Sequence, residues 1–477
     1  MPKNIIIFSD GTGQAGGLRP DETRSNIYKL YRATRCGPDT CIDPLEQLAF
    51  YDAGLGSQPP GGALFIARAV RWLHNLASQA TGLGITTNII DCYAAIIRMW
   101  EPGDRIFLFG FSRGAYTVRC LAAVLTQCGV PTKMADGSSL RRDVGSTTLI
   151  AREAVKNVYQ HVSSPEDTVY LPQREALAKR FRERYGSGVG SAANALPFFI
   201  GVFDTVASLG SYVLFAALVG GTAILIAAIS FLQSLFLFPF LPTLLWTASA
   251  AAVAAGIGYV ATHLKYAVGL SGFSLRETIH LASPKMKFYD LHLNNAVWYA
   301  RHAMSIDENR ADFARVPWGS SQNKGPKRPD EYPDWLQQVW FAGNHSDIGG
   351  SYPENEARLS DITLGWMVHA AKNLPDGKSS DGFGIKVDDR YMALHPDPLG
   401  PQHDEREPGF LGGRFKWKAG SRDVQEVAIL HSSVLTRFAA PEGVQHFYER
   451  GDYRPPNLAD HLKLKQYYAA DRKDGGS

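Results

Sequence analysis

The feature that most constrains the fold of this chain is a long segment without charge. Residues 205–264 hold no Asp, Glu, Lys or Arg, and Pro239 and Pro242 divide them into two apolar halves. The halves 212–238 and 244–264 each approach the ~20 apolar residues that a helix needs to cross a bilayer. Because soluble folds rarely leave so many residues uncharged, the segment predicts an apolar helical hairpin.

Two interpretations of this hairpin, inserted at 209–265, stay open. As a membrane element, residues 212–264 would enter the bilayer and keep the rest of the chain on one side. Basic residues such as Lys265 and Arg276 favour the cytoplasmic side. As a soluble element, the hairpin would be an apolar cap over a cleft or part of a core. We predict the membrane-associated form, with the globular part in the cytoplasm.

Outside the hairpin, short apolar runs alternate with longer stretches of helical period, which is typical of a mostly parallel sheet flanked by helices. Strands are predicted at 5–8, 49–51, 105–109, 197–203, 287–291 and 338–342. Helices are predicted at 24–33, 63–79, 86–100, 114–128, 141–161, 174–184, 294–306 and 361–373. We therefore predict one α/β core formed by residues 1–208 and 266–375, with a loop-rich C-terminal extension at 376–477 packed on it.

The composition argues against several classes of partner. Lys and Arg number 49 against 46 Asp and Glu, without a basic run interleaved with aromatic residues, so no nucleic acid is expected. The five cysteines form no C-x-x-C pair, which predicts neither a disulfide framework nor a metal site. A strand-like run begins at Asn4 without a basic and apolar leader before it, so no cleaved signal peptide is expected.

A nucleophile motif follows the third predicted strand. Gly110-Phe-Ser-Arg-Gly114 lies between the apolar run 105–109 and the amphipathic stretch 114–128, which gives the order strand, sharp turn, helix. Gly110 and Gly114 suit this turn because a side chain at either flank would collide with its neighbours. Ser112 would lie at a helix start, where free N–H groups favour a developing oxyanion. The pattern predicts Ser112 as the nucleophile of an α/β-hydrolase-type enzyme.

A serine nucleophile needs an acid and a base, which in this fold class follow the serine along the chain at strand ends. Asp204 ends the predicted strand 197–203, and His345 follows the strand at 338–342. We predict Asp204 as the acid and His345 as the base. Asp347 is the alternative acid, although its closeness to His345 suits a residue that organises the loop. Alternative bases are His280, His292, His302, placed in a predicted helix, and His431.

The oxyanion of an acyl-transfer intermediate needs N–H donors. The N–H of Arg113, directly after Ser112, is the first expected donor. The loop Phe8-Ser-Asp-Gly-Thr-Gly13 follows the first predicted strand, so Gly11 or Thr12 is expected to supply the second. A phosphate-binding loop is the alternative, but the Gly-Lys-Ser/Thr of a nucleotide P-loop is missing.

Five segments together resemble the α/β-hydrolase family that includes the type VI secretion phospholipase effectors of the first lipase class. They are FSDGT at 8–12, GFSRGA at 110–115, VFDTV at 202–206, AMSIDENR at 303–310 and WFAGNHSDIGG at 340–350. The resemblance covers most of residues 3–350, apart from the apolar insert. It implies Ser112 as nucleophile, Asp204 as acid, His345 as base, and hydrolysis of a lipid acyl ester. The hairpin directly after Asp204 sets this chain apart from the secreted effectors.

The predicted function is that of a serine hydrolase that cleaves acyl esters of lipids, phospholipids above all, at a membrane surface through an acyl-enzyme, with no metal or organic cofactor. A carboxylesterase or thioesterase with a small acyl substrate is one alternative, which chain-length preference would distinguish. A non-catalytic, membrane-anchored interaction protein with the same fold is another. It would be favoured if Ser112, Asp204 and His345 did not come together.

Overall fold

The computed structural model describes residues 2–11, 23–54, 83–206, 212–235, 239–282, 293–319, 334–374, 383–406, 416–446 and 449–474. A six-stranded sheet forms its centre, in the spatial order β10-β9-β6-β3-β1-β2, and each neighbouring pair of strands is parallel. Its strands are β1 (Asn4–Ser9), β2 (Gln47–Asp52), β3 (Arg105–Phe111), β6 (Pro197–Phe203), β9 (Tyr299–Ser305) and β10 (Leu336–Phe341). The predicted α/β fold with a mostly parallel sheet is confirmed.

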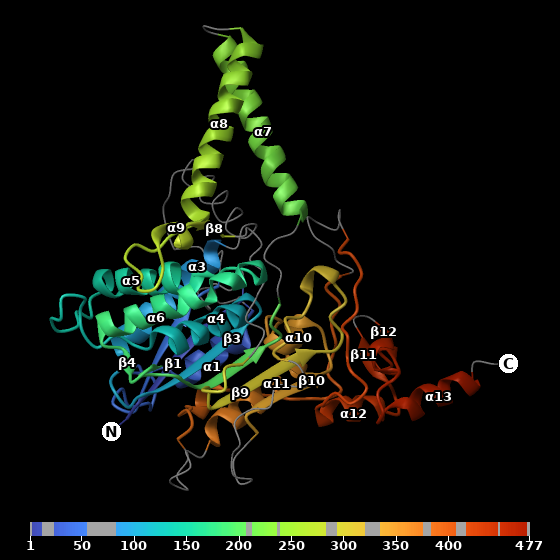
Figure 1. Cartoon of the computed structure of the whole chain (residues 1–477). Helices are drawn as coiled ribbons and strands as arrows, with labels where there is room; N and C mark the ends of the chain where they lie inside the picture. The colour runs from blue at the N-terminus through green and yellow to red at the C-terminus, as the bar shows by residue number, and fades with distance from the viewer. Residues whose placement is uncertain are drawn as a thin grey trace.

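Helices cover both faces of the sheet, as a parallel sheet requires (Figure 1). Side chains of β1 alternate between two cores, with Ile5 and Ile7 in one and Ile6 and Phe8 in the other. The helices of the first core are α3 (Leu83–Met99), α4 (Arg113–Cys128), α5 (Val144–Arg152) and α6 (Leu171–Tyr185), and those of the second are α1 (Asn26–Thr34) and α11 (Arg358–Lys372). All parallel strands therefore end at one edge of a sheet that is buried on both sides.

The segment predicted as a helix at 294–306 contains a strand, so that prediction was wrong. β9 pairs with β6 and β10, and its seven residues are all buried. Arg301 and His302 interrupt its apolar run. The resulting mixture of polar and apolar residues led to the prediction of an amphipathic helix. Nη1 of Arg301 donates to the main-chain oxygens of Ala300 and Asp334, 2.8 Å each, and such bonds let a strand of the sheet interior hold an arginine.

Other predicted elements differ less. The helix predicted at 141–161 is α5, followed by a π-helical turn at Glu153–Val158 and a 3₁₀ turn at Tyr159–His161. The strand predicted at 287–291 and the helix predicted at 63–79 lie outside the described residues. The remaining predicted helices and strands are present, with ends displaced by a few residues at most.

The apolar segment forms two helices, α7 (Tyr212–Ser234) and α8 (Phe240–His263), that project from the sheet domain as a hairpin (Figure 1). Ser230 Oγ and Thr247 Oγ1 are 2.8 Å apart and join the two helices. Among the described residues, one helix, Phe240–Ala261, is long and apolar enough to cross a membrane, and its most apolar window is 0% buried. The hairpin thus exposes large apolar side chains, such as Trp246 and Ile257, that the sheet domain does not cover.

The C-terminal region packs against the edge of the sheet at β10. Leu430 forms a bridge to Trp340 of β10, and a small core joins Met304 and Trp340 to Val434 and Phe438. The elements of this region are α12 (Ser432–Phe438), the hairpin of β11 (Val444–His446) and β12 (Glu449–Gly451), and α13 (Lys465–Asp474). Residues after α11 therefore cover the side of the sheet where β9 and β10 end.

Short elements complete the described chain. They are the pairs β4 (Gly188–Val189) with β5 (Ala192–Ala193) and β7 (Leu264–Lys265) with β8 (His280–Leu281), the helices α9 (Leu275–Thr278) and α10 (His345–Gly349), and 3₁₀ turns at Pro165–Tyr170, Ala311–Phe313, Asp389–Tyr391 and Pro456–Leu458.

Gly114→Ala should destabilise the fold. A Cβ at this position in the first turn of α4 would collide with the main-chain oxygen of Ser9 on β1. We expect the free energy of unfolding, measured in urea, to fall by about 1–3 kcal/mol, as for other overpacked sites. Gly365→Ala in α11 is the matched control, since its Cβ would lie 3.7 Å from Leu394, an ordinary contact. The control should be neutral or more stable by up to ~1 kcal/mol, and equal losses in both variants would contradict the close α4–β1 contact.

Candidate active site

Ser112 lies in a strained turn between β3 and α4. Its backbone has φ 57° and ψ −119°, a conformation that residues with a side chain rarely adopt. The N–H of Ser112 donates to the main-chain oxygen of Phe203, 3.1 Å away, which ties the turn to the end of β6. A Cβ at Gly110 would lie 2.6 Å from the Cα of Ala115, so this flank requires glycine, as Gly114 does. Strand, sharp turn and helix follow one another in the predicted order.

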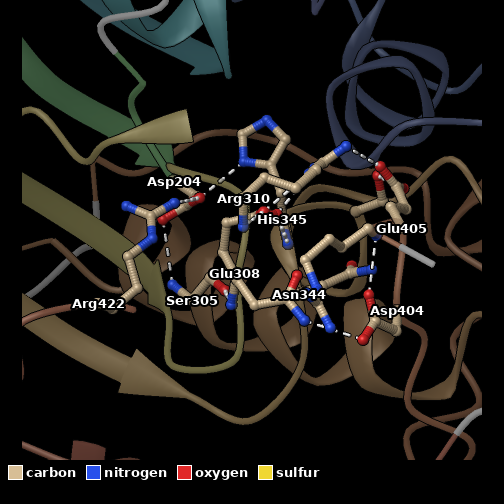
Figure 2. A network of polar contacts seen from close by, with 12 residues as sticks. Asp204, Ser305, Glu308, Arg310, Asn344, His345, Asp404, Glu405 and Arg422 are labelled. Carbon is tan, nitrogen blue, oxygen red and sulfur yellow. Dashed lines mark hydrogen bonds and ion pairs between the residues drawn. The ribbon is translucent and has the colours of Figure 1, made fainter. Parts of the chain in front are cut away.

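Asp204 and His345 meet at the same edge of the sheet. Asp204 directly follows β6, and His345 is the first residue of α10, which follows β10. Oδ2 of Asp204 lies 2.6 Å from Nδ1 of His345, and its Oδ1 accepts from the N–H of Ser305, 3.1 Å away (Figure 2). Both side chains are buried. The parallel strands thus bring together residues that are 141 positions apart in the sequence.

The hydrogen bonds define the tautomer of the histidine. An ionised carboxylate only accepts, so Nδ1 of His345 donates to Asp204 and Nε2 of the neutral ring is left as an acceptor. That Nε2 is buried and has no hydrogen-bond partner within the described part of the chain. The ring of Phe111, the residue before Ser112, lies 4.7 Å from the His345 ring, centroid to centroid. A buried acceptor is therefore available beside the Ser112 turn, and in free enzymes the serine–histidine hydrogen bond is often not yet formed.

A cation that the sequence analysis missed contacts the same carboxylate. Nη2 of Arg422 lies 2.7 Å from Oδ2 of Asp204, and both side chains are buried. Burial alone would raise the pKa of Asp204, but the charge of Arg422 and the hydrogen bonds from His345 and Ser305 outweigh it and hold that pKa well below its usual range. Arg422 follows Asp204 by 218 positions, and no motif marks it.

This chain matches the profile of a known family. Residues 3–232 and 264–370, more than half of the chain, match the family described as "T6SS, Phospholipase effector Tle1-like, catalytic domain". The chain belongs to this family. The resemblance seen in the sequence is confirmed. The match includes most of α7 but omits residues 233–263, which hold the end of α7 and all of α8. It ends before the C-terminal region.

One curated protein and two solved structures are similar to this Tle1-like chain. An uncharacterized protein of Saccharomyces cerevisiae, YEL023C, is 30% identical over 210 residues, which are 44% of this chain and 27% of the yeast protein. The chain therefore spans about a quarter of that relative's length. The crystal structure of an uncharacterized protein from Pseudomonas aeruginosa is 15% identical, with a TM-score of 0.34, over 83% of this chain and 48% of that one. The Tle1 effector bound to the VgrG spike of the type VI secretion system is also 15% identical, with a TM-score of 0.30, over 75% and 53% of the two chains. The family assignment rests on the sequence match alone.

Asp347, the alternative acid, has other partners in the Tle1-like domain. Its Oδ2 accepts from the N–H groups of Asn344 and His403, both at 3.0 Å, and its Oδ1 lies 2.8 Å from Nδ1 of His403. Asn344 in turn caps α10 by accepting from the N–H of Asp347 at 2.9 Å. Of the two carboxylates, Asp204 and not Asp347 bonds the ring of His345.

A charged network holds the loop that carries His345 (Figure 2). The N–H of His345 donates to Glu308 at 3.3 Å, and the same carboxylate forms two 2.8 Å bonds with Arg310. Arg310 also pairs with Glu405, which accepts from the hydroxyl of Ser346 at 2.7 Å. Glu308 and Arg310 lie in the segment 303–310 that carries the family resemblance, but no role was predicted for them. Glu405 was missed altogether.

The three predicted oxyanion donors, Arg113, Gly11 and Thr12, differ in whether the structure leaves their N–H available. Arg113 is the first residue of α4, where helix N–H groups lack intrahelical acceptors. Gly11 lies beside the Ser112 turn. A Cβ built on Gly11 would be 3.5 Å from the Cβ of Ser112. Its N–H, however, donates to Oδ1 of Asp10 at 2.7 Å, so Gly11 already has an acceptor in this structure. Thr12 lies outside the described residues.

The alternative histidines have other surroundings. His302 is in β9, not in a helix, and its burial lowers the pKa of the ring to about 3. His280 stacks on Tyr170, and His431 caps α12. His292 lies outside the described residues. Among the residues that the structure describes, no three His, Cys, Asp or Glu side chains are grouped so as to hold a metal ion.

Asp204→Asn should abolish most hydrolysis, because the amide can donate to Nδ1 of His345 and so favour the wrong tautomer. We expect the kcat for a phospholipid to fall on the order of 10³–10⁴-fold. Asp347→Asn is the matched carboxylate-to-amide change and should keep most of the activity. Its effect should instead be a lower free energy of unfolding, measured in urea. A larger loss of kcat in Asp347→Asn than in Asp204→Asn would make Asp347 the acid.

Proposed function

We propose that this chain is a serine hydrolase that cleaves acyl esters of phospholipids at a membrane surface through an acyl-enzyme on Ser112. The family assignment supplies the class of reaction. The observation that carries the proposal is the buried Asp204–His345 pair, whose Nε2 is unpaired among the described residues beside the strained Ser112 turn. Such a pair is what a serine hydroxyl needs for activation.

In the proposed acylation step, Nε2 of His345 takes the proton of Ser112 Oγ as Oγ attacks the acyl carbonyl carbon. The tetrahedral oxyanion accepts from the N–H of Arg113 at the start of α4. The bond from the carbonyl carbon to the alcohol oxygen then breaks, and His345 gives its proton to that oxygen. Asp204, already bonded to Nδ1, stabilises the imidazolium while it exists.

Deacylation repeats these events with water. His345 takes a proton from the water that attacks the acyl carbon, and it returns that proton to Ser112 as the ester bond to Oγ breaks. A fatty acid leaves, and the free serine is restored. The two half-reactions consume one water per ester and need no oxidant or reductant.

The hairpin supports a site of action at a bilayer. Exposed apolar side chains line α7 and α8, among them Ile224 at 72% exposure and Trp246 at 78%. A surface of this kind is unstable in water and stable in lipid. The hydrogen bond between Ser230 and Thr247 suits two helices that pack together without solvent.

An apolar face continues at the base of the hairpin. β7 begins at Leu264, directly after α8, and Leu264 pairs with Leu281 of β8. Leu264, Tyr266 and Val268 are exposed, whereas Ala267 between the last two is buried. Ile279 and Leu281 are exposed in the same way. We propose that this face rests on the bilayer surface that the hairpin enters, with the catalytic domain on the cytoplasmic side.

Ser112→Ala should abolish covalent labelling by a fluorophosphonate probe, because the activated hydroxyl attacks the phosphorus of the probe, displaces fluoride and becomes phosphonylated. In-gel fluorescence of the purified wild type and variant measures this, and the melting temperature of each confirms that both are folded. Labelling that survives in Ser112→Ala would refute the serine as nucleophile.

Lipid profiling decides the substrate. The wild type, but not Ser112→Ala, should release fatty acid and lysophospholipid from mixed phospholipid vesicles. A marked preference for short soluble esters or thioesters would instead support the esterase alternative.

Deletion of residues 212–263, replaced by a short Gly/Ser linker, should move the protein from the membrane pellet to the supernatant after a carbonate wash. The deletion should keep its activity on a short soluble ester, which shows that the site is intact. Val253→Arg is a second test, because a central arginine costs about 2.5–3.5 kcal/mol on insertion. A wild type that stays soluble without detergent, with no change on deletion, would contradict membrane insertion.

A further inference from the structure

We propose that Arg422 is a positioning residue of the catalytic site, which holds the carboxylate of Asp204 in place beside His345. The inference rests on the proposed function, since it concerns the base that activates Ser112. It extends the site beyond the part of the chain that matches the family profile, which ends at residue 370.

The geometry ties Arg422 to the acid. Its Nη2 and Nδ1 of His345 both approach Oδ2 of Asp204, at 2.7 and 2.6 Å. Nε and Nη1 of Arg422 are buried and have no hydrogen-bond partner among the described residues. Asp204 is therefore the group that this guanidinium binds, whereas a structural arginine would spread its donors over several main-chain oxygens.

The chain around Arg422 is held close to residues 309–311, which follow Glu308. The N–H of Ala311 donates to the main-chain oxygen of Lys418, and the N–H of Gly420 donates to that of Asn309, at 2.9 and 2.8 Å. A Cβ at Gly420 would lie 2.7 Å from the Cα of Ala311, so only glycine permits this approach. The backbone thus delivers Arg422 to Asp204 in a fixed position.

Several other charges surround the pair and stay in place when Arg422 is changed. Arg315 acts on Asp204 from a longer range, and its own pKa is lowered, mostly by burial. Glu308 accepts from the N–H of His345, and the charge of Glu405 also acts on that ring. His302 is neutral at physiological pH. Arg422 is the one cation of this set that the structure places in direct contact with the acid.

The shared oxygen has a chemical consequence. A carboxylate that faces histidine alone stabilises the imidazolium with its full charge and so raises the pKa of the ring. Arg422 offsets part of this charge and repels the imidazolium directly. The charge of Arg422 thereby bears on the proton transfer from Ser112 to His345 that the proposed function requires.

The test is the pH dependence of Ser112 labelling by a fluorophosphonate, measured as a rate constant between about pH 5 and pH 9 on the full chain. Arg422→Gln and Arg422→Met remove the charge, and the second keeps most of the side-chain volume. Arg422→Lys keeps the charge. Arg437→Gln is the matched control, because buried Arg437 binds the main-chain oxygens of Pro398 and Gly400 and has no contact with Asp204.

The acidic limb is the part of the profile where the labelling rate constant falls as the pH falls. In both neutral variants we expect this limb to shift to higher pH by on the order of one unit, and the maximal rate constant to be lower. Arg422→Lys should keep the wild-type limb, and Arg437→Gln should lower the melting temperature without moving the limb. An unchanged limb in a folded neutral variant would overturn the inference. If the wild type is not labelled at Ser112 at all, the proposed function fails instead, so the two failures are distinguishable.

Discussion

A carboxylate buried at the end of a central strand must find partners for its charge inside the protein, because an unpaired buried charge costs more free energy than a domain can spare. Asp204 finds three. The N–H of Ser305 comes from β9, the ring of His345 from α10, and the guanidinium of Arg422 from the C-terminal region. Each partner belongs to a different part of the chain. Burial of this side chain in its ionised form therefore depends on the joint assembly of the sheet, the loop after β10 and the C-terminal region.

Local chemistry was enough to single out the candidate residues at the ends of the strands. A strained serine needs glycines beside it, so the turn at Ser112 has a signature within five residues. Asp204 and His345 were found because both follow apolar strands whose parallel pairing brings their ends together. In the structure Asp204 and His345 contact each other, and the ring of His345 packs on Phe111 in the turn. Their catalytic roles are part of the proposed function.

What the sequence did not reveal depends on contacts between distant segments. Arg422 and Glu405 lie in polar stretches without a motif, and only the packing of the C-terminal region on β10 brings them to the loop at 305–310. β9 was mistaken for a helix for the same reason. Arg301 is acceptable in a buried strand because main-chain oxygens, including that of Asp334, receive its donors, and no local pattern encodes that partner.

The position of Arg422 in the chain also has a consequence for biosynthesis. A ribosome releases α7 and α8 well before it reaches His345 and Arg422, and at 5–20 residues per second the interval between the end of α8 and Arg422 is roughly 10–30 s. A hairpin that enters a bilayer co-translationally has this time to do so. Under the proposed function, such a chain would reach the membrane while Asp204 still lacks its contacts with His345 and Arg422. Hydrolytic competence would then arise only after the hairpin has entered the bilayer.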